Sequence, residues 1–370
     1  MTGFDLPDWQ RYCGTVIRAA ARATDAAAQV SAEVWAGLSE RGYLGLFHGP
    51  TSPHLVPAML ALAEACSATF WRATLSSALA GQMIASFGAP AVRSRWLAGL
   101  VSGREIGAFA ASERGSGSDP ASYAARLRRR GDRWILSGAK DRITGATDAT
   151  VAAVLCQAED EARAPLGLAL AFVGLDDPRV TRIRRQTLGL RGMSFGQLAF
   201  ADVALDDADV TLGTAMPRIL TVVEWGQVVQ ALCGLGVGHA ALAEAERFLS
   251  DRRSFGRALA AHAAVRAQLD DAADALAAGG AIARAALAAK ADGGVAGEAV
   301  VIAKIFCTEA GLAACQTALR LCGGWGYTTE LEVERMVRDA YGNIPAGLPN
   351  DRLRELLIAP RVGVDPWAVH

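Results

Sequence analysis

The sequence predicts an α+β fold in which helical regions flank a segment of strands. Apolar residues recur every three or four positions from Asp25 to Leu44 and from Pro57 to Leu100, which is the period of packed helices. Short runs rich in Val, Ile, Leu and Phe, separated by Gly, Asp and Pro, fill residues 106–205 and are typical of strands. The helical period returns near residue 215 and persists to Pro360. Strands and helices do not alternate regularly, which disfavours a parallel doubly wound sheet.

This order of elements divides the chain into three segments. Residues 1–105 are expected to form an all-helical N-terminal domain, residues 106–210 a middle β domain and residues 211–370 a helical C-terminal domain. The helices of the last segment are expected at 217–250, 260–290, 294–322, 330–340 and 351–358.

Composition and charge indicate an ordinary globular protein. The chain has 370 residues, of which 52% are hydrophobic, and its 37 basic residues nearly balance 38 acidic ones. This balance gives no net field that would attract nucleic acid or an anionic membrane, so we expect neither partner. Seven cysteines without a C-x-x-C pair are expected to be reduced and buried, and a polar N-terminus unlike a signal peptide also favours a cytoplasmic protein. Five histidines lack metal-ligand spacing.

One apolar stretch, Trp225 to Ala243, carries no formal charge and is long enough to span a membrane. Gln227, Gln230, His239 and four glycines interrupt it, so a buried helix is the favoured interpretation. The glycines of "GLGVGHA" within this stretch indicate close helix packing, because no strand precedes them as a dinucleotide fingerprint requires.

Two motifs in the β segment could line a ligand site. "ASERGSGSD", Ala111 to Asp119, follows an apolar run and brings hydroxyls, glycines and backbone N–H groups into a short loop that can approach a phosphate or a ring. "ILSGAKDRITGAT", Ile135 to Thr147, reads as a strand, a Ser-Gly turn and a second short strand, which by itself is a hairpin.

Two motifs in the C-terminal helices carry many charges. "SDRRSFGRAL" gathers three arginines at a helix end, either as a solvated terminus or as an anion clamp. In "LCGGWGYTTELEVERMVRDA", paired glycines break one helix, and Thr328 and Thr329 are expected to cap the next. Its charged residues are expected to pair along that helix.

Taken in this order, the four motifs resemble those of the acyl-CoA dehydrogenase family of flavoproteins. "FAASERGSGSD" is similar to the family loop T-E-P-x-A-G-S-D, and "WILSGAKDRIT" to W-x-L-x-G-x-K-x-x-I-T. "LGLRGMSFGQLAFADVAL" resembles the strand pair that closes the family's β domain. "DRRSFGRAL" resembles E-R-x-x-F-G-x-x-I, and "CGGWGYTTELEVERMVRDA" resembles G-G-x-G-Y…E-R-x-x-R-D-A.

The resemblance implies a small antiparallel, barrel-like β domain, a C-terminal four-helix bundle, and a homodimer or homotetramer that binds FAD near subunit contacts. Arg252 and Phe255 would contact FAD from a neighbouring subunit. The substrate would be an acyl thioester of CoA or of an acyl carrier protein, and the electron acceptor a flavoprotein or oxygen. The implied cofactor-binding residues are Phe109, Ala110, Ala111, Ser112, Ser118, Arg142, Thr144, Arg252, Phe255, Arg320 and Gly324. The implied substrate-binding residues are Ser118, Glu224 and Gln227.

Several positions depart from the family pattern. Where the family has I-x-E-G-T with a glutamate base, this chain has "IPAGL", which puts Ala346 at the position of the carboxylate. The alternative base position falls on Gly226, so no catalytic residue is assigned. Further departures are Arg142 for tryptophan, Arg320 for glutamine, Leu348 for threonine, Ala263 for glutamine, and Glu224 with Gln227 for an Asp and Arg pair.

Three functions are compatible with this pattern. The first is an FAD enzyme that oxidises an acyl thioester and uses another group or water as base. The second is a flavin-dependent monooxygenase, which needs no base for an α-proton. The third is a non-catalytic homologue or partner subunit, because the losses around the flavin could abolish FAD binding.

Overall fold

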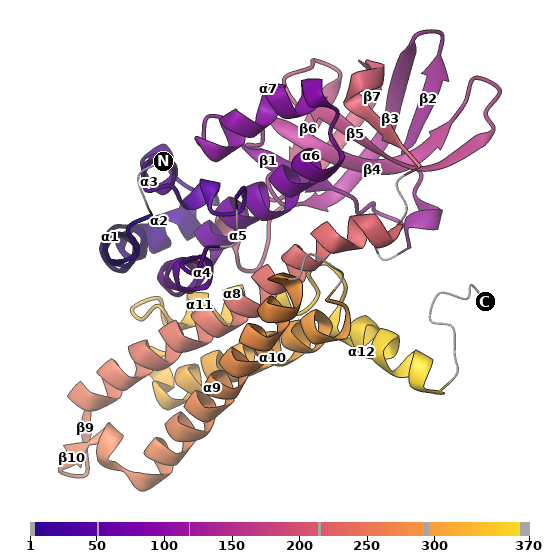
Figure 1. The fold of residues 1–370 in the computed structure, drawn as a ribbon. Coiled ribbons are helices and arrows are strands. Elements are labelled where there is room, and N and C mark those ends of the chain that lie inside the picture. The colour runs from indigo at the N-terminus through magenta and orange to yellow at the C-terminus, as the bar shows by residue number, and fades with distance from the viewer. Residues whose placement is uncertain (1–3, 50–51, 118, 214–215, 292–295, 363–370) are drawn as a thin grey trace.

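The computed structural model describes residues 4–49, 52–117, 119–213, 216–291 and 296–362. Helices form both ends of the chain and a sheet forms the middle, which confirms the predicted α+β class (Figure 1). The N-terminal helices lie between the sheet and the long C-terminal helices.

The N-terminal segment is helical, as predicted. Side chains cap the N-termini of two of its helices. Asp5 accepts a hydrogen bond from the N–H of Asp8 at 2.9 Å, and Ser31 accepts one from the N–H of Val34 at 3.2 Å. A π-helical turn, η3, lies between α5 and α6. The α-helices are α1 (Leu6–Tyr12), α2 (Arg18–Ala27), α3 (Ala32–Glu40), α4 (Leu55–Ala65), α5 (Ser67–Leu75), α6 (Gln82–Phe87) and α7 (Pro90–Val101), and η3 is Ser76–Gly81.

The middle segment forms an eight-stranded sheet in which the path β6-β7-β3-β2-β4-β5-β8 is continuous and β1 pairs with β4. Most pairs are antiparallel, as predicted. Two are not, because β1 and β2 both run parallel to β4. The strands are β1 (Gly107–Ala110), β2 (Arg126–Arg130), β3 (Arg133–Ile143), β4 (Val151–Glu159), β5 (Pro165–Gly174), β6 (Val180–Arg184), β7 (Gly196–Leu205) and β8 (Val210–Leu212).

The predicted hairpin within Ile135–Thr147 is wrong. β3 is one strand that runs through Ser137 and Gly138 without turning, and it pairs with β7 on one side and β2 on the other. Gly138 has φ +125°, and a Cβ there would lie 2.7 Å from the Cα of Ala125. The glycine therefore permits a close approach between strands instead of a turn.

The C-terminal segment is a helical bundle with its helices close to the predicted positions. They are α8 (Met216–Asp251), α9 (Ala263–Ala291), α10 (Glu298–Leu321), α11 (Val333–Asn343) and α12 (Asn350–Ile358), and a short hairpin of β9 (Arg253–Ser254) and β10 (Arg257–Ala258) joins α8 to α9. Length and hydropathy would allow α8 and α9 to cross a membrane. In α8, however, 83% of the most apolar stretch is buried, which confirms the predicted buried helix.

Glycines in α8 permit close helix packing, as predicted. A Cβ on Gly234 would lie 2.5 Å from the carbonyl oxygen of Cys307 on α10, and one on Gly236 would lie 2.5 Å from the Cβ of Ala63 on α4. The predicted caps of α11 are wrong, since this helix begins at Val333 with Glu332 at the N-cap position, after Thr328 and Thr329. The predicted charge pairs are present, with Arg335 bound to Glu332 and Asp339, and Arg338 to Glu334.

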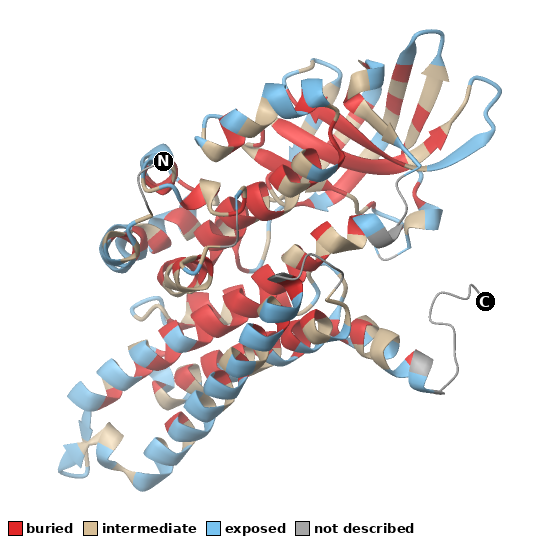
Figure 2. Ribbon diagram, viewed as in Figure 1, coloured by how far each residue is buried: buried red, intermediate tan, exposed pale blue. Residues whose placement is uncertain are grey.

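The buried core joins the two helical segments. Side chains of α1 and α4 pack in one cluster with those of α8, α9 and α10, and Figure 2 shows this buried zone where α8 meets the N-terminal helices. A second cluster lies within the sheet, and a third joins α6 and α7 to β4 and β5. All seven cysteines are free and buried, as predicted.

Candidate functional site

The loop that follows β1 runs along β3. The N–H of Asp141 donates to the carbonyl oxygen of Ser112 at 2.9 Å, and the ammonium of Lys140 donates to that of Ala111 at 2.9 Å. The guanidinium of Arg142 donates to the carbonyl of Glu113. These contacts bring the predicted residues Phe109 to Ser112 together with Arg142 and Thr144 in one wall, which we call the flavin wall. Ser118, the remaining predicted residue of this loop, lies outside the described residues.

A buried ion pair anchors the flavin wall. The ammonium of Lys140 lies 2.7 Å from a carboxylate oxygen of Glu113, with both side chains buried, and 3.9 Å from the centre of the Tyr123 ring. The same carboxylate accepts hydrogen bonds from the N–H groups of Ala124 and Ala125 at 2.6 and 3.0 Å. Burial acts to raise the pKa of Glu113, but Lys140 and the two N–H groups outweigh it and keep the pKa below its usual range.

Sequence reasoning missed this pair. A signal was available, because Lys140 is one of only three lysines in the chain and Glu113 stands among the small residues of the loop Ala111–Asp119. A charged residue among apolar and small neighbours is seldom buried without a partner, so each could have been expected to have one.

The residues present in the flavin wall suit a planar, hydrogen-bonding ring. The N–H of Ser112 takes no part in the backbone hydrogen bonds of the described loop. Thr144 is half-buried, and its hydroxyl contacts only the sulfur of Met193, at 3.8 Å, within the described part of the chain. These two groups are available to a ligand. Arg142, which stands in place of the family tryptophan, is exposed and has φ +61°.

Lys304 of α10 holds the loop that carries Ala346 in place by hydrogen bonds. The buried ammonium of Lys304 donates to the carbonyl oxygens of Ile344 and Leu348, at 2.9 and 3.1 Å, and to the side chain of Asn350. Ala346 lies between the two anchored carbonyls and is half-buried at the edge of the helical core. Its methyl group cannot accept a proton.

Gly226, the alternative position that the resemblance assigns to a base, also lacks a carboxylate. Gly226 lies on α8, and a Cβ there would meet only the side chain of Leu79 of η3, at 3.9 Å. A side chain would therefore find space at Gly226. The two positions that the resemblance assigns to a base thus carry a methyl group and a hydrogen atom in this chain.

The surroundings of Glu224 give no support to its predicted substrate contact. Its carboxylate lies 2.7 Å from the ammonium of Lys290 and accepts hydrogen bonds from the N–H groups of Ala296 and Gly297 at 3.1 and 2.6 Å. Glu224 is buried and holds the start of α10 against α8. The structure gives this carboxylate a structural role, and Gln227 is the predicted substrate residue that keeps a free polar atom.

The remaining predicted cofactor residues lie far from the flavin wall. Arg252, Phe255, Arg320 and Gly324 are exposed, and Phe255 has 94% of its surface accessible. The 36 residues of α8 span about 54 Å at 1.5 Å per residue, and Phe255 follows its far end (Figure 1). One chain therefore does not bring these residues to its own flavin wall.

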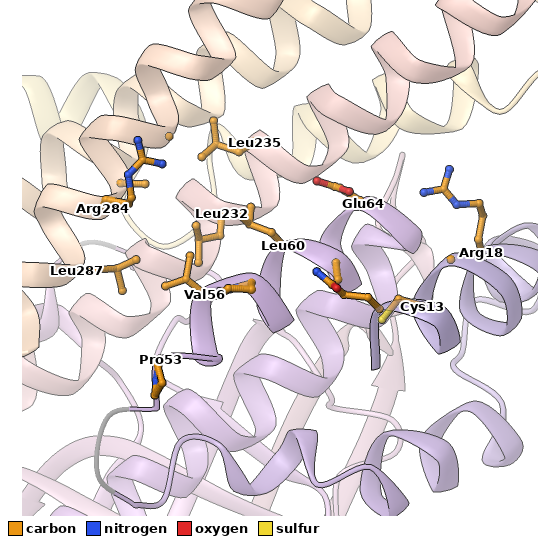
Figure 3. Close-up of a pocket in the computed structure, with 16 residues that line it drawn as sticks. Cys13, Arg18, Pro53, Val56, Leu60, Glu64, Leu232, Leu235, Arg284 and Leu287 are labelled. Carbon is orange, nitrogen blue, oxygen red and sulfur yellow. The ribbon is translucent and has the colours of Figure 1, made fainter. Parts of the chain in front are cut away.

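A cavity of about 750 Å³ lies elsewhere, between the N-terminal helices and the bundle. Figure 3 shows an apolar floor that includes Leu60, Leu232 and Leu235, with Arg18 and Glu64 at its rim. It contains none of the predicted site residues and no loop of small hydroxyl side chains. We therefore place the candidate site at the flavin wall, where the hydrogen-bonding groups converge.

The fold and the flavin wall together define the class of protein. Models of the N-terminal, middle and C-terminal domains of acyl-CoA dehydrogenases match residues 8–104, 108–203 and 216–357. The chain belongs to the acyl-CoA dehydrogenase family, which confirms the resemblance seen in the sequence.

Individual relatives agree with this assignment. The mitochondrial short-chain specific acyl-CoA dehydrogenase of Homo sapiens is 30% identical over 286 residues, which cover 76% of this chain and 69% of that protein. The mitochondrial isobutyryl-CoA dehydrogenase of Bos taurus is 29% identical over 76% of this chain and 68% of its own length.

Solved structures show the same fold. An acyl-CoA dehydrogenase from Geobacillus kaustophilus superposes with a TM-score of 0.89 at 22% identity and covers 97% of both chains. A glutaryl-CoA dehydrogenase from Mycobacterium smegmatis in complex with FADH2 gives 0.90 at 21% identity, over 97% of this chain and 93% of that one.

Proposed function

We propose that this chain is an FAD-dependent oxidoreductase that dehydrogenates an acyl thioester carried by CoA or by an acyl carrier protein. Membership of the acyl-CoA dehydrogenase family supports the reaction class. The observation that carries the proposal is the flavin wall, in which the loop Ala111–Glu113 is tied to β3 by Lys140, Asp141 and Arg142.

The flavin wall would hold the ring of FAD. Ser112 offers a backbone N–H and Thr144 a hydroxyl, and both belong to segments fixed by buried contacts. Bound FAD would accept a hydride from the β-carbon of the substrate. The task of the chain's own residues is to orient the thioester against this wall, to exclude water, and to find a destination for the α-proton.

The α-proton has no carboxylate at either position that serves the family. Ala346 and Gly226 cannot accept it, so we propose that another group or a water molecule does. A positioned base contributes about a hundred- to ten-thousandfold to such a rate. A slow oxidation, or one with a more acidic substrate, is therefore expected.

The absence of an arginine at position 227 bears on the nature of the carrier, while the amide of Gln227 itself is available to another part of the substrate. In the family pattern an arginine occupies this position, and its replacement by a neutral amide removes a charge on the substrate side. This change suits a carrier that lacks the adenosine phosphates of CoA. We propose that the electrons pass on to an electron-accepting flavoprotein or to oxygen.

We also propose that the chain works as a homodimer or homotetramer. Arg252, Phe255, Arg320 and Gly324 are exposed and far from the flavin wall of their own chain, so they would serve the site of a neighbouring subunit. In α9 only 22% of the most apolar stretch is buried, and a partner would cover such a face. The seven free, buried thiols support a reducing compartment such as the cytoplasm.

The absorbance of the purified protein tests this function. A yellow protein whose flavin bleaches when acyl-CoA or acyl-carrier thioesters are added anaerobically would support the proposal. A colourless protein that cannot be reconstituted with FAD would support a non-catalytic partner subunit instead. A yellow protein that does not bleach, but consumes oxygen with NADH and a reductase, would indicate a monooxygenase.

A further inference from the structure

Two buried amides of α8 have no hydrogen-bond partner for their oxygens. Gln227 and Gln230 are 9% and 5% exposed, and among the residues that the structure describes nothing donates to either amide oxygen. An unsatisfied buried polar group destabilises the folded state, and such groups are rare in folded proteins. Two of them one turn apart on a single helix therefore call for a ligand.

Both amides lie on the face of α8 that borders the candidate site. Gly226, Gln227 and Gln230 share this face, because residues three and four apart are neighbours on a helix. At one end, Gly226 faces Leu79 of η3. At the other, a Cβ added to Gly347 would lie 3.0 Å from the amide nitrogen of Gln230, so this amide lies against the residue that follows Ala346.

The end of this face at Gly226 connects through η3 to the flavin wall. η3 packs on β1, where the N–H of Gly107 donates to the hydroxyl of Ser76 at 2.8 Å, and β1 contains Phe109 and Ala110 of the flavin wall. The face of α8 that carries the two amides is therefore bounded by η3, which packs on β1, at one end and by the Ala346 loop at the other. This is the region in which the proposed function puts the acyl group.

A third polar group borders the same region. The ring centroids of Phe47 and of Trp225 on α8 lie 6.4 Å apart. The residue after Phe47, His48, packs against Gly81 of η3. The buried Nε2 of His48 has no hydrogen-bond partner in the described part of the chain. Burial lowers the pKa of His48, which favours the neutral form of its ring.

These observations lead to the class of substrate. We propose that Gln227 and Gln230 form a polar recess that binds a hydroxyl group on the acyl part of the substrate, so that the preferred substrate is a hydroxyacyl thioester. The inference rests on the proposed function for the position of the acyl group. A purely apolar acyl chain would leave both amide oxygens unsatisfied, whereas a hydroxyl donates a hydrogen bond and can also accept one from an amide N–H.

The experiment compares matched thioesters by titration calorimetry on the full-length protein as purified. The probes are butyryl-CoA, 2-hydroxybutyryl-CoA and 3-hydroxybutyryl-CoA. One of the hydroxylated probes is expected to bind at least about tenfold more tightly than butyryl-CoA, because a site built for a hydroxyl discriminates strongly against its absence. Equal binding of all three would overturn the proposal and would mean that water satisfies the amides.

Gln230→Leu and Gln227→Leu test the residues. Each is expected to reduce the ratio of affinities for the hydroxylated and the plain probe to near onefold, and to leave the melting temperature of the free protein unchanged or higher. Gln268→Leu is the matched control, because Gln268 is a half-buried glutamine on α9 that bonds to the carbonyl of Ala264 in its own helix. A lower melting temperature with equal loss of all probes would instead show a structural role.

The outcomes also separate this proposal from the proposed function. If butyryl-CoA bleached the flavin as readily as the hydroxylated thioesters do, the proposed dehydrogenase function would be supported and the proposed polar recess would be refuted. A tenfold preference for a hydroxylated probe in calorimetry, without bleaching of the flavin, would support the polar recess and refute the dehydrogenation.

Discussion

The ammonium group of Lys304 on α10 lies 3.1 Å from the carbonyl oxygen of Leu348, two residues beyond Ala346. A second bond to the carbonyl of Ile344 fixes the other end of the same short segment. Lys304 is fully buried, and burial lowers its pKa to about 8. One side chain therefore holds the segment that carries Ala346 at both of its ends.

Lys304→Met is expected to destabilise the protein by about 3 kcal/mol. The substitution keeps most of the volume but leaves two carbonyls and the side chain of Asn350 without their donor. Urea unfolding measures the change. Arg354→Met is the control, because Arg354 pairs with Glu309 near the surface and such pairs contribute about 0–1 kcal/mol. Equal losses in the two variants would show that Lys304 does not hold the loop.

The same lysine predicts a pH dependence. Below pH 8 Lys304 is protonated in both the folded and the unfolded chain. Between about 8 and the ordinary value of 10.5, the unfolded chain binds a proton that the folded chain does not, so this group makes the folded state more stable as pH rises.

Buried thiols act in the opposite sense above pH 9, since burial raises the pKa of Cys156 and Cys233 to about 12. The measurement is therefore the difference in unfolding free energy between the parent and Lys304→Met at pH 7, 8 and 9. This difference should grow in favour of the parent between pH 8 and 9, by up to about 1.4 kcal/mol per pH unit. A flat or decreasing difference would contradict the assignment to Lys304.

The pair of Glu113 and Lys140 predicts a coupling between stability and flavin content. Lys140→Met or Glu113→Gln alone leaves an unpaired polar group in a buried site and is expected to cost about 3–5 kcal/mol. The double variant should cost less than the sum of the two single ones. Because the pair anchors the flavin wall, each single variant should also be purified with less FAD per chain.

Denaturant unfolding and the flavin-to-protein absorbance ratio check this prediction. A single variant of the exposed pair Asp177 and Arg179, such as Asp177→Asn, provides the control and should change neither quantity. If the Lys140 and Glu113 variants retained full flavin content, the pair would stabilise the sheet without positioning the loop.

Local sequence was sufficient for the helices and for the extent of the strand-rich segment, because those follow from periodicity within ten to twenty residues. The residues of the flavin wall were assigned by resemblance of motifs, and their role stays a prediction. Local sequence was insufficient where a residue's partner is distant. Lys304 and Leu348 are separated by 44 positions, and nothing near Lys304 in the sequence indicates the loop that it holds. Glu224 was assigned to the substrate by its place in the family motif, and its partners in the structure, Lys290 and Gly297, are too remote in sequence to have indicated another role.

The error at Gly138 has a related cause. Ser-Gly is a common turn signal, yet this glycine is needed because Ala125 of the neighbouring chain segment comes within 2.7 Å of where its Cβ would be. A glycine selected by a tertiary contact and one selected by a turn look identical in one sequence. Only the pairing of β3 with both β2 and β7 distinguishes them.

Ala346→Glu tests whether the site lacks only its base. The position is half-buried between two carbonyls that Lys304 holds in place, so a glutamate there would start from a fixed backbone. If the loop still faces the flavin as in the family, the new carboxylate should raise α,β-dehydrogenation of butyryl-CoA by on the order of a hundredfold. The rate of anaerobic flavin bleaching in a single turnover measures this. Ala346→Gln has the same size and no basicity, so it should give no gain. If the two variants were equally fast or equally slow, the geometry of the pocket would have changed along with the residue at 346.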